Sequence, residues 1–266
     1  MKKILQFANI IAFAITIYFN YASSAGVFNN TTQADMSAAY QNLFTPAGYA
    51  FAIWGLIYLL LLGFIVYQAR SLFTTVRDDA FVLKTGWWFV LSCAANSLWC
   101  YLFVSEMLLA SVFVIFFLLF CLLKIVVNNR MELDDKPISV IVFLWWPFVI
   151  YSGWLTVACI ANVSLYLVKL EWNGFGISPT LWTLFMIGIA TSINLLVTWR
   201  RNMREFALVG AWALVAIAVA NWESIASIQF IALAAAAILV LSSSIHAFKN
   251  RDTNPAKKCM EYFNNR

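Results

Sequence analysis

Four residues spaced four apart, Pro46, Ala50, Trp54 and Tyr58, form the most distinctive pattern in this chain. Residues at this spacing lie on one face of an α-helix, and Pro46 suits the first turn, where its missing backbone N–H breaks no helical hydrogen bond. Two aromatic rings therefore project from one ridge of an apolar helix that follows a polar loop. We expect this ridge to face a ligand.

Two later apolar segments carry aromatic and amide residues at helical spacing. One face consists of Trp88, Ser92, Asn96 and Trp99, and the other of Pro147, Tyr151, Trp154, Ala158 and Asn162. A membrane-embedded asparagine either hydrogen-bonds to a neighbouring helix or lines a polar cavity, and the pattern leaves both readings open. Pro147 should kink its helix, which either opens a pocket or fits a long segment to the bilayer.

No group of residues indicates catalysis or a metal centre. The five cysteines show no C-x-x-C spacing, and we interpret them as free thiols, four of them within apolar segments. The single histidine, His246, excludes a multi-histidine metal site within one chain, and the acidic residues all lie in loops or at segment ends. We expect no catalytic residue, no metal and no required cofactor.

The composition is that of an integral membrane protein. Hydrophobic residues make up 63% of the 266 positions and charged residues only 11%, whereas soluble domains are roughly 45–50% apolar. Eight apolar runs approach the roughly 20 residues that cross a bilayer. They lie near residues 4–22, 46–68, 86–104, 107–128, 140–165, 180–199, 205–221 and 225–247. The predicted fold is an all-α, polytopic membrane bundle of eight transmembrane helices.

The distribution of charge predicts the orientation. With the N-terminus inside, sixteen of the seventeen lysines and arginines fall on the inner side and only Lys169 on the outer side. An alternative is that the first segment is a signal peptide, because Lys2 and Lys3 precede an apolar stretch and small residues near Ser24. Cleavage there would leave seven helices.

The connections divide the chain into three parts. The longest outer loop, about residues 23–45, is either a lid over a site or a solvated spacer. After Pro179 small residues dominate, so we expect the segments 205–221 and 225–247 to form a tightly packed hairpin. We predict a five-helix membrane bundle over residues 1–168, three additional helices over 169–249 and a polar cytoplasmic tail over 250–266.

Three motifs in order give the chain a resemblance to the TspO/MBR family of tryptophan-rich sensory and translocator proteins. They read Phe44-x-Pro46…Phe51-x-x-Trp54-x-x-x-Tyr58, then Asn96-x-x-Trp99 with Tyr101-x-Phe103, then Pro147-Phe148-x-x-Tyr151-x-x-Trp154-x-x-x-Ala158-x-x-x-Asn162. The resemblance covers roughly residues 4–168, which would be the five-helix bundle of the family, so the chain looks like an extended, divergent member.

The resemblance implies a membrane receptor, sensor or carrier that binds a hydrophobic planar ligand, such as a porphyrin or haem-type tetrapyrrole or a sterol. It also implies a homodimer and, with the predicted orientation, a multi-pass protein of a bacterial inner membrane with both termini cytoplasmic. Two alternatives are a small-solute or lipid transporter and a porphyrin-modifying membrane enzyme. The cavity residues that the resemblance implies are Trp54, Tyr58, Asn96, Trp99, Trp146, Tyr151, Trp154 and Asn162.

Overall fold

A computed structural model describes residues 1–76, 79–250 and 257–260. Every regular element in these ranges is helical, so the predicted all-α fold is confirmed for the described part of the chain. The elements are α1 (Lys2–Ser24), α2 (Gln33–Ala39), η1 (Gly48–Ala52), α3 (Ile53–Phe73), α4 (Phe81–Thr85), α5 (Trp88–Val104), α6 (Leu108–Asn128), α7 (Ile138–Val140), η2 (Ile141–Trp145), α8 (Trp146–Lys169), η3 (Gly174–Gly176), α9 (Pro179–Arg201), α10 (Arg204–Ala220) and α11 (Ala226–Lys249).

Long helices form in all eight places where the sequence predicted a membrane span. Within the described ranges, six helical segments are long and apolar enough to cross a bilayer: α1, η1 with α3, α6, α7 through α8, α9 and α11. The helix α5 is apolar but shorter, and α10 has 17 residues and begins with Arg204 and Glu205. The helical membrane bundle is confirmed, whereas the count of eight spans stays a prediction.

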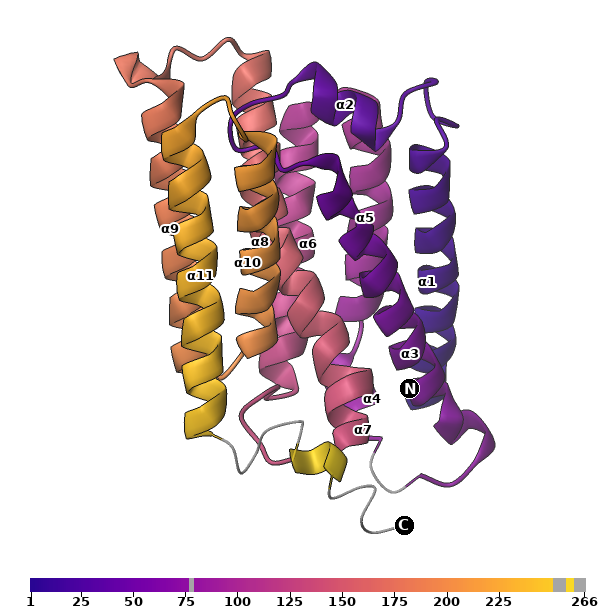
Figure 1. Cartoon of the computed structure of the whole chain (residues 1–266). Coiled ribbons are helices and arrows are strands. Elements are labelled where there is room, and N and C mark those ends of the chain that lie inside the picture. The colour runs from indigo at the N-terminus through magenta and orange to yellow at the C-terminus, as the bar shows by residue number, and fades with distance from the viewer. Residues whose placement is uncertain (77–78, 251–256, 261–266) are drawn as a thin grey trace.

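The helices stand side by side with α8 near the middle of the bundle (Figure 1). The helix α8 packs against α3, α6 and α10, while α1 lies at one edge against α3 and α5. At the opposite edge α9 packs against α11. The start of α1 and the end of α11 lie at the same end of the bundle, as an even number of spans requires. The side of the membrane that this end faces stays a prediction.

The predicted kink at Pro147 takes the form of a widened helical turn. The segment η2 is π-helical and directly precedes Pro147 in the first turn of α8. Proline lacks the N–H that would bond to the preceding turn, and a π-turn accommodates the lost hydrogen bond. The segment from α7 through α8, which contains this turn, is the most buried of the six candidate spans. Its side chains therefore lie in the centre of the bundle.

Two glycines bring α10 close to its neighbours. A Cβ atom on Gly153 of α8 would lie 3.0 Å from the carbonyl oxygen of Phe206, and one on Gly210 would lie 2.5 Å from Oδ1 of Asn194 on α9. Small residues let membrane helices approach in this way. The helix α10 also packs along α11, and the two helices together form the predicted hairpin. Through α10 the last three helices join the first part of the chain.

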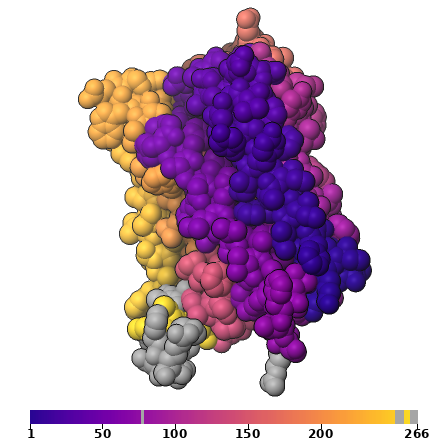
Figure 2. Space-filling view, turned by 90° about the vertical axis from the view of Figure 1, so that its right-hand side faces the viewer, coloured from indigo at the N-terminus to yellow at the C-terminus, as the bar shows by residue number. Residues whose placement is uncertain are grey.

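The connection between α1 and α3, which the sequence predicted as the longest outer loop, contains a short helix. The helix α2 begins with a capping box: Thr32 Oγ1 accepts the Asp35 N–H at 3.1 Å, and Asp35 Oδ2 accepts the Thr32 N–H at 2.9 Å. Hydrogen bonds from Thr32 hold the pKa of Asp35 below its usual range. Seen from the side of α1, the atoms of α1, this connection and α3 form one continuous face of the molecule (Figure 2).

The predicted polar tail falls mostly outside the described residues, as do Arg77, Arg251 and Arg266, three of the sixteen basic residues predicted on the inner side. Its described part beyond Asn250, residues 257–260, is helical. There Lys258 Nζ lies 2.8 Å from Asp135 Oδ1, so this part of the tail contacts the loop between α6 and α7.

Candidate functional site

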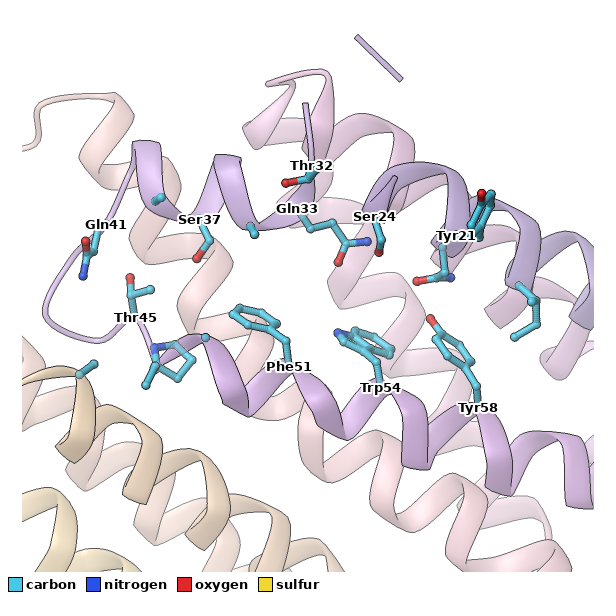
Figure 3. Close-up of a pocket in the computed structure, with 18 residues that line it drawn as sticks. Tyr21, Ser24, Thr32, Gln33, Ser37, Gln41, Thr45, Phe51, Trp54 and Tyr58 are labelled. Carbon is cyan, nitrogen blue, oxygen red and sulfur yellow. The ribbon is translucent and has the colours of Figure 1, made fainter. Parts of the chain in front are cut away.

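A cavity of about 690 Å³ lies between α1, the α2 connection and the first turns of α3 (Figure 3). Its volume is in the range of small-molecule sites, roughly 300–1,000 Å³. Polar side chains of α1 and α2 face the rings of Phe51, Trp54 and Tyr58 across it. The α2 segment covers this end of the bundle, so α2 has the position of a lid.

Trp54 is the centre of the aromatic wall. Its ring stacks on that of Tyr58, with centroids 5.6 Å apart and planes 16° apart, and it lies tilted against Trp99 at 6.4 Å. It also meets Tyr151 and Trp154 edge-on, at 5.6 and 6.3 Å. The faces that the sequence predicted on three separate spans therefore converge at one indole ring.

A smaller cavity of about 50 Å³ continues behind Trp54. Trp99, Trp154 and Asn162 line it, together with residues that also line the larger cavity: Gln33, Ser37, Thr45, Pro46, Phe51 and Trp54. These shared residues make the two cavities neighbours, with the small one directed into the bundle between α5 and α8.

Asn96 connects three helices through hydrogen bonds. Asn20 of α1 donates from Nδ2 to Asn96 Oδ1 at 2.6 Å, and Asn96 donates from Nδ2 to the Tyr151 hydroxyl of α8 at 2.7 Å. Asn20 lines the large cavity, whereas Asn96 and Tyr151 are buried and line neither cavity. The Asn96 amide therefore links Asn20, which lines the cavity, to Tyr151 in the core of the bundle.

Asn162 both hydrogen-bonds to neighbouring helices and lines a cavity, the two roles that the sequence left open. Its Oδ1 accepts a hydrogen bond from Trp99 Nε1 at 2.8 Å, and its Nδ2 donates to Ser111 Oγ of α6 at 3.0 Å. The same side chain lines the small cavity. These bonds set the orientation of the Trp99 ring.

The structure distributes seven of the eight predicted site residues over three layers. Trp54 and Tyr58 line the large cavity, Trp99, Trp154 and Asn162 line the small one, and Asn96 and Tyr151 lie behind them. Trp146 lines neither cavity and is half-buried against the core of the bundle. Whether these residues bind a ligand stays a prediction.

Sequence reasoning missed the wall opposite the aromatic ridge. This wall consists of polar residues from α1 and from the α2 connection: Asn20, Ser24, Gln33, Ser37 and Gln41. The signal was present as spacing, because Asn20 and Ser24 are four apart, and so are Gln33, Ser37 and Gln41. The capping box at Thr32 marked the start of the helix that presents the second group.

A polar cluster attaches the lid to the rest of the bundle. Tyr40, at the end of α2, donates its hydroxyl hydrogen to Glu106 Oε1 in the turn between α5 and α6. Lys169 Nζ lies 3.1 Å from the same oxygen. The Tyr40 hydrogen bond and then Lys169 hold the pKa of Glu106 below its usual range, and the same hydrogen bond raises the pKa of Tyr40.

The helix α10 holds the chain that leads into α3. The Ala47 N–H donates to the Ala216 carbonyl at 3.0 Å, and Asn221 Nδ2 donates to the Leu43 carbonyl at 3.0 Å. Ala220 of α10 also lines the large cavity. One of the three additional helices is therefore part of the cavity mouth.

The described residues contain no group of three or more His, Cys, Asp or Glu side chains that could hold a metal ion. Cys93, Cys100, Cys121 and Cys159 are buried free thiols, as predicted. His246 is buried against Trp199 near the end of α11, at the end of the bundle opposite α2.

A comparison of the chain with models of known protein families gives a match. The model of a family described as TSPO-like protein matches residues 6–245 and so includes the last three helices. A search of curated proteins and a search of solved structures found no match. At a coarse level this match and the helices describe an integral membrane protein of the ligand-binding or sensor class. The chain belongs to the TSPO-like family, as the three sequence motifs predicted.

Proposed function

We propose that this protein is a receptor, sensor or carrier that binds a hydrophobic planar ligand, such as a tetrapyrrole or a sterol-like molecule, in the cavity beneath α2. The observation that carries the proposal is the stacked pair of Trp54 and Tyr58 along a cavity of about 690 Å³. Aromatic faces bind flat ring systems by stacking, and a few polar groups orient them. The amide and hydroxyl groups of α1 and α2 are those polar groups.

We assign the cavity to the outer side of a bacterial inner membrane. Lys2 and Lys3 at the start of α1, and Arg200 and Arg201 at the end of α9, lie at the end of the bundle opposite α2. Positively charged residues favour the cytoplasmic side. A ligand would then reach the site from the outer leaflet or the outer aqueous side.

Titration of the full-length protein in lipid nanodiscs with a porphyrin, and separately with a fluorescent sterol, tests the proposal. We expect saturable quenching of tryptophan fluorescence by the porphyrin, or saturable energy transfer to the sterol. Trp54→Ala and Trp154→Ala should raise the Kd at least about tenfold, or about 1.4 kcal/mol. The matched control is Trp87→Ala, because Trp87 is exposed and directly precedes α5, whose start lies at the end of the bundle opposite α2. Unchanged affinity in both pocket variants would exclude this cavity, and no saturable binding of either ligand would exclude the ligand class.

A further inference from the structure

The walls of both cavities are uncharged. Among the described residues that line them, the polar side chains are amides, hydroxyls and indoles, and none is lysine, arginine, histidine, aspartate or glutamate. Figure 3 shows the amide of Gln33 and the hydroxyls of Ser24, Ser37 and Thr45 around the large cavity. Such groups can hydrogen-bond to a neutral ligand, but they cannot neutralise an ionised one.

Two polar groups at the aromatic wall are buried without a hydrogen-bond partner. They are the Tyr58 hydroxyl and the Trp154 indole N–H. The rings of Tyr58 and Trp154 both contact the ring of Trp54. The Asn96 amide beside Tyr58 is already engaged, since it donates to Tyr151 and accepts from Asn20. A buried donor without a partner costs about 1–3 kcal/mol, and at Tyr58, whose side chain lines the large cavity, an acceptor atom on a ligand would remove that cost.

The surroundings of the cavity offer no compensating positive charge. The described residues at the α2 end of the bundle include four acids, Asp35, Glu106, Glu171 and Glu223, and one base, Lys169. Lys169 is already paired with Glu106 at 3.1 Å. An anionic ligand would therefore approach a mouth of net negative charge and find no cation inside it.

We infer that the site selects flat, uncharged ligands that carry oxygen or nitrogen acceptors, and that it discriminates against carboxylated ones. The inference rests on the proposed function and narrows its ligand class. The physical reason is desolvation, because a carboxylate moved into an uncharged, half-buried site loses hydration that amides and hydroxyls replace only in part. A neutral acceptor meets the Tyr58 hydroxyl, whose side chain lines the large cavity, without this cost.

A pair of probes that differ only in charge tests the inference. Protoporphyrin IX carries two carboxylates, and its dimethyl ester has the same ring with both carboxylates neutralised. Each is titrated into the full-length protein in nanodiscs of neutral lipid, and the signal of the Trp54→Ala variant is subtracted to remove partitioning into lipid. We expect the ester to bind at least about tenfold more tightly, equivalent to about 1.4 kcal/mol.

A charge-introducing variant makes the test independent of probe solubility. Gln41 is exposed and lines the cavity, so Gln41→Arg should fold and place a cation at the mouth. It should lower the Kd of the diacid about tenfold more than it changes the Kd of the ester. Ser227→Arg is the matched control, because Ser227 is exposed at the same end of the bundle but does not line the cavity. Tyr58→Phe should weaken binding of the ester several-fold while Trp54 keeps its stacking partner.

The outcomes separate this inference from the proposed function. Diacid binding as tight as that of the ester in the unmodified chain overturns the charge selectivity and leaves the proposed function standing. An equal gain of diacid affinity in Gln41→Arg and Ser227→Arg also overturns it, since the effect would then be long-range attraction rather than contact in the site. If neither porphyrin nor a fluorescent sterol binds saturably, the proposed function fails, and the inference fails with it.

Discussion

Asn221 directly follows the last residue of α10. Its side chain donates a hydrogen bond to the backbone carbonyl of Leu43, 178 positions earlier in the chain, at 3.0 Å. In the same helix, the Ala216 carbonyl accepts a hydrogen bond from the Ala47 N–H. The ring of Trp212 packs against that of Tyr49, with centroids 5.2 Å apart. These contacts fix the chain that connects the lid to the aromatic ridge. The additional helices therefore take part in the site through its mouth.

Replacing Asn221 with alanine should loosen this mouth. The Leu43 carbonyl would lose its side-chain donor, at a cost of about 1 kcal/mol, and we expect faster ligand dissociation with little change in the aromatic wall. Stopped-flow release of a bound porphyrin ester measures the rate. Ser244→Ala is the control, because Ser244 is an exposed serine of α11 that bonds only within its own helix. An unchanged dissociation rate would show that α10 does not control access.

The Trp99 and Asn162 pair should contribute measurably to stability. Their hydrogen bond at 2.8 Å is buried, and such bonds in membrane proteins are worth about 0.6–2 kcal/mol. A double-mutant cycle of Trp99→Phe and Asn162→Leu, followed by reversible unfolding in mixed micelles, isolates the coupling. We expect a coupling free energy in that range, and additivity of the two changes would contradict the assigned bond.

Gly153 should not tolerate a larger side chain. The Cβ atom of alanine there would press on the backbone of Phe206 at 3.0 Å, so Gly153→Ala should destabilise the fold by about 1–3 kcal/mol through overpacking between α8 and α10. Gly188→Ala on α9 is a direct control, since a Cβ atom there meets nothing within 4 Å. Thermal unfolding in detergent compares the two variants. Equal melting temperatures would mean that α8 and α10 are less closely packed than we describe.

Glu132 should make stability depend on pH. It lies in the loop after α6, yet it is only 4% exposed, and burial, with the nearby charge of Glu205, raises its pKa from 4.5 to about 8, although Arg204 acts in the opposite direction. The folded state therefore binds more protons than the unfolded state between these two values. Stability should fall as pH rises through that window, because the unfolded state binds fewer protons there.

Glu132→Gln keeps the shape of the neutral carboxyl group and removes the titration. We expect melting temperatures of the variant to fall less than those of the unmodified chain as pH rises from about 5 to about 8. Glu223→Gln, at an exposed position of the turn after α10, should leave the slope unchanged. Parallel slopes for the unmodified chain and Glu132→Gln would contradict the raised pKa. The sequence places Glu132 in a loop, and loop position by itself does not show that a side chain is buried.

Much of the architecture was readable from the sequence. Apolar runs near 20 residues correspond to long helices because a chain in lipid must satisfy its backbone hydrogen bonds within each segment. The spacing of Trp54 and Tyr58, and of Asn96 and Trp99, correctly put each pair on one helical face, since α-helical periodicity is a local property. Three motifs on three helices also identified the family.

What the sequence by itself determined is therefore local: where each helix runs, which residues share a face and which family the chain belongs to. Only the tertiary structure decided that the face opposite Trp54 comes from Asn20 and Gln33, that Trp146 stays outside both cavities, and that α10 holds the mouth. The reason is geometric. The rotation and spacing of each helix depend on close contacts such as Gly153 against Phe206, and these join residues far apart in the chain, where periodicity carries no information.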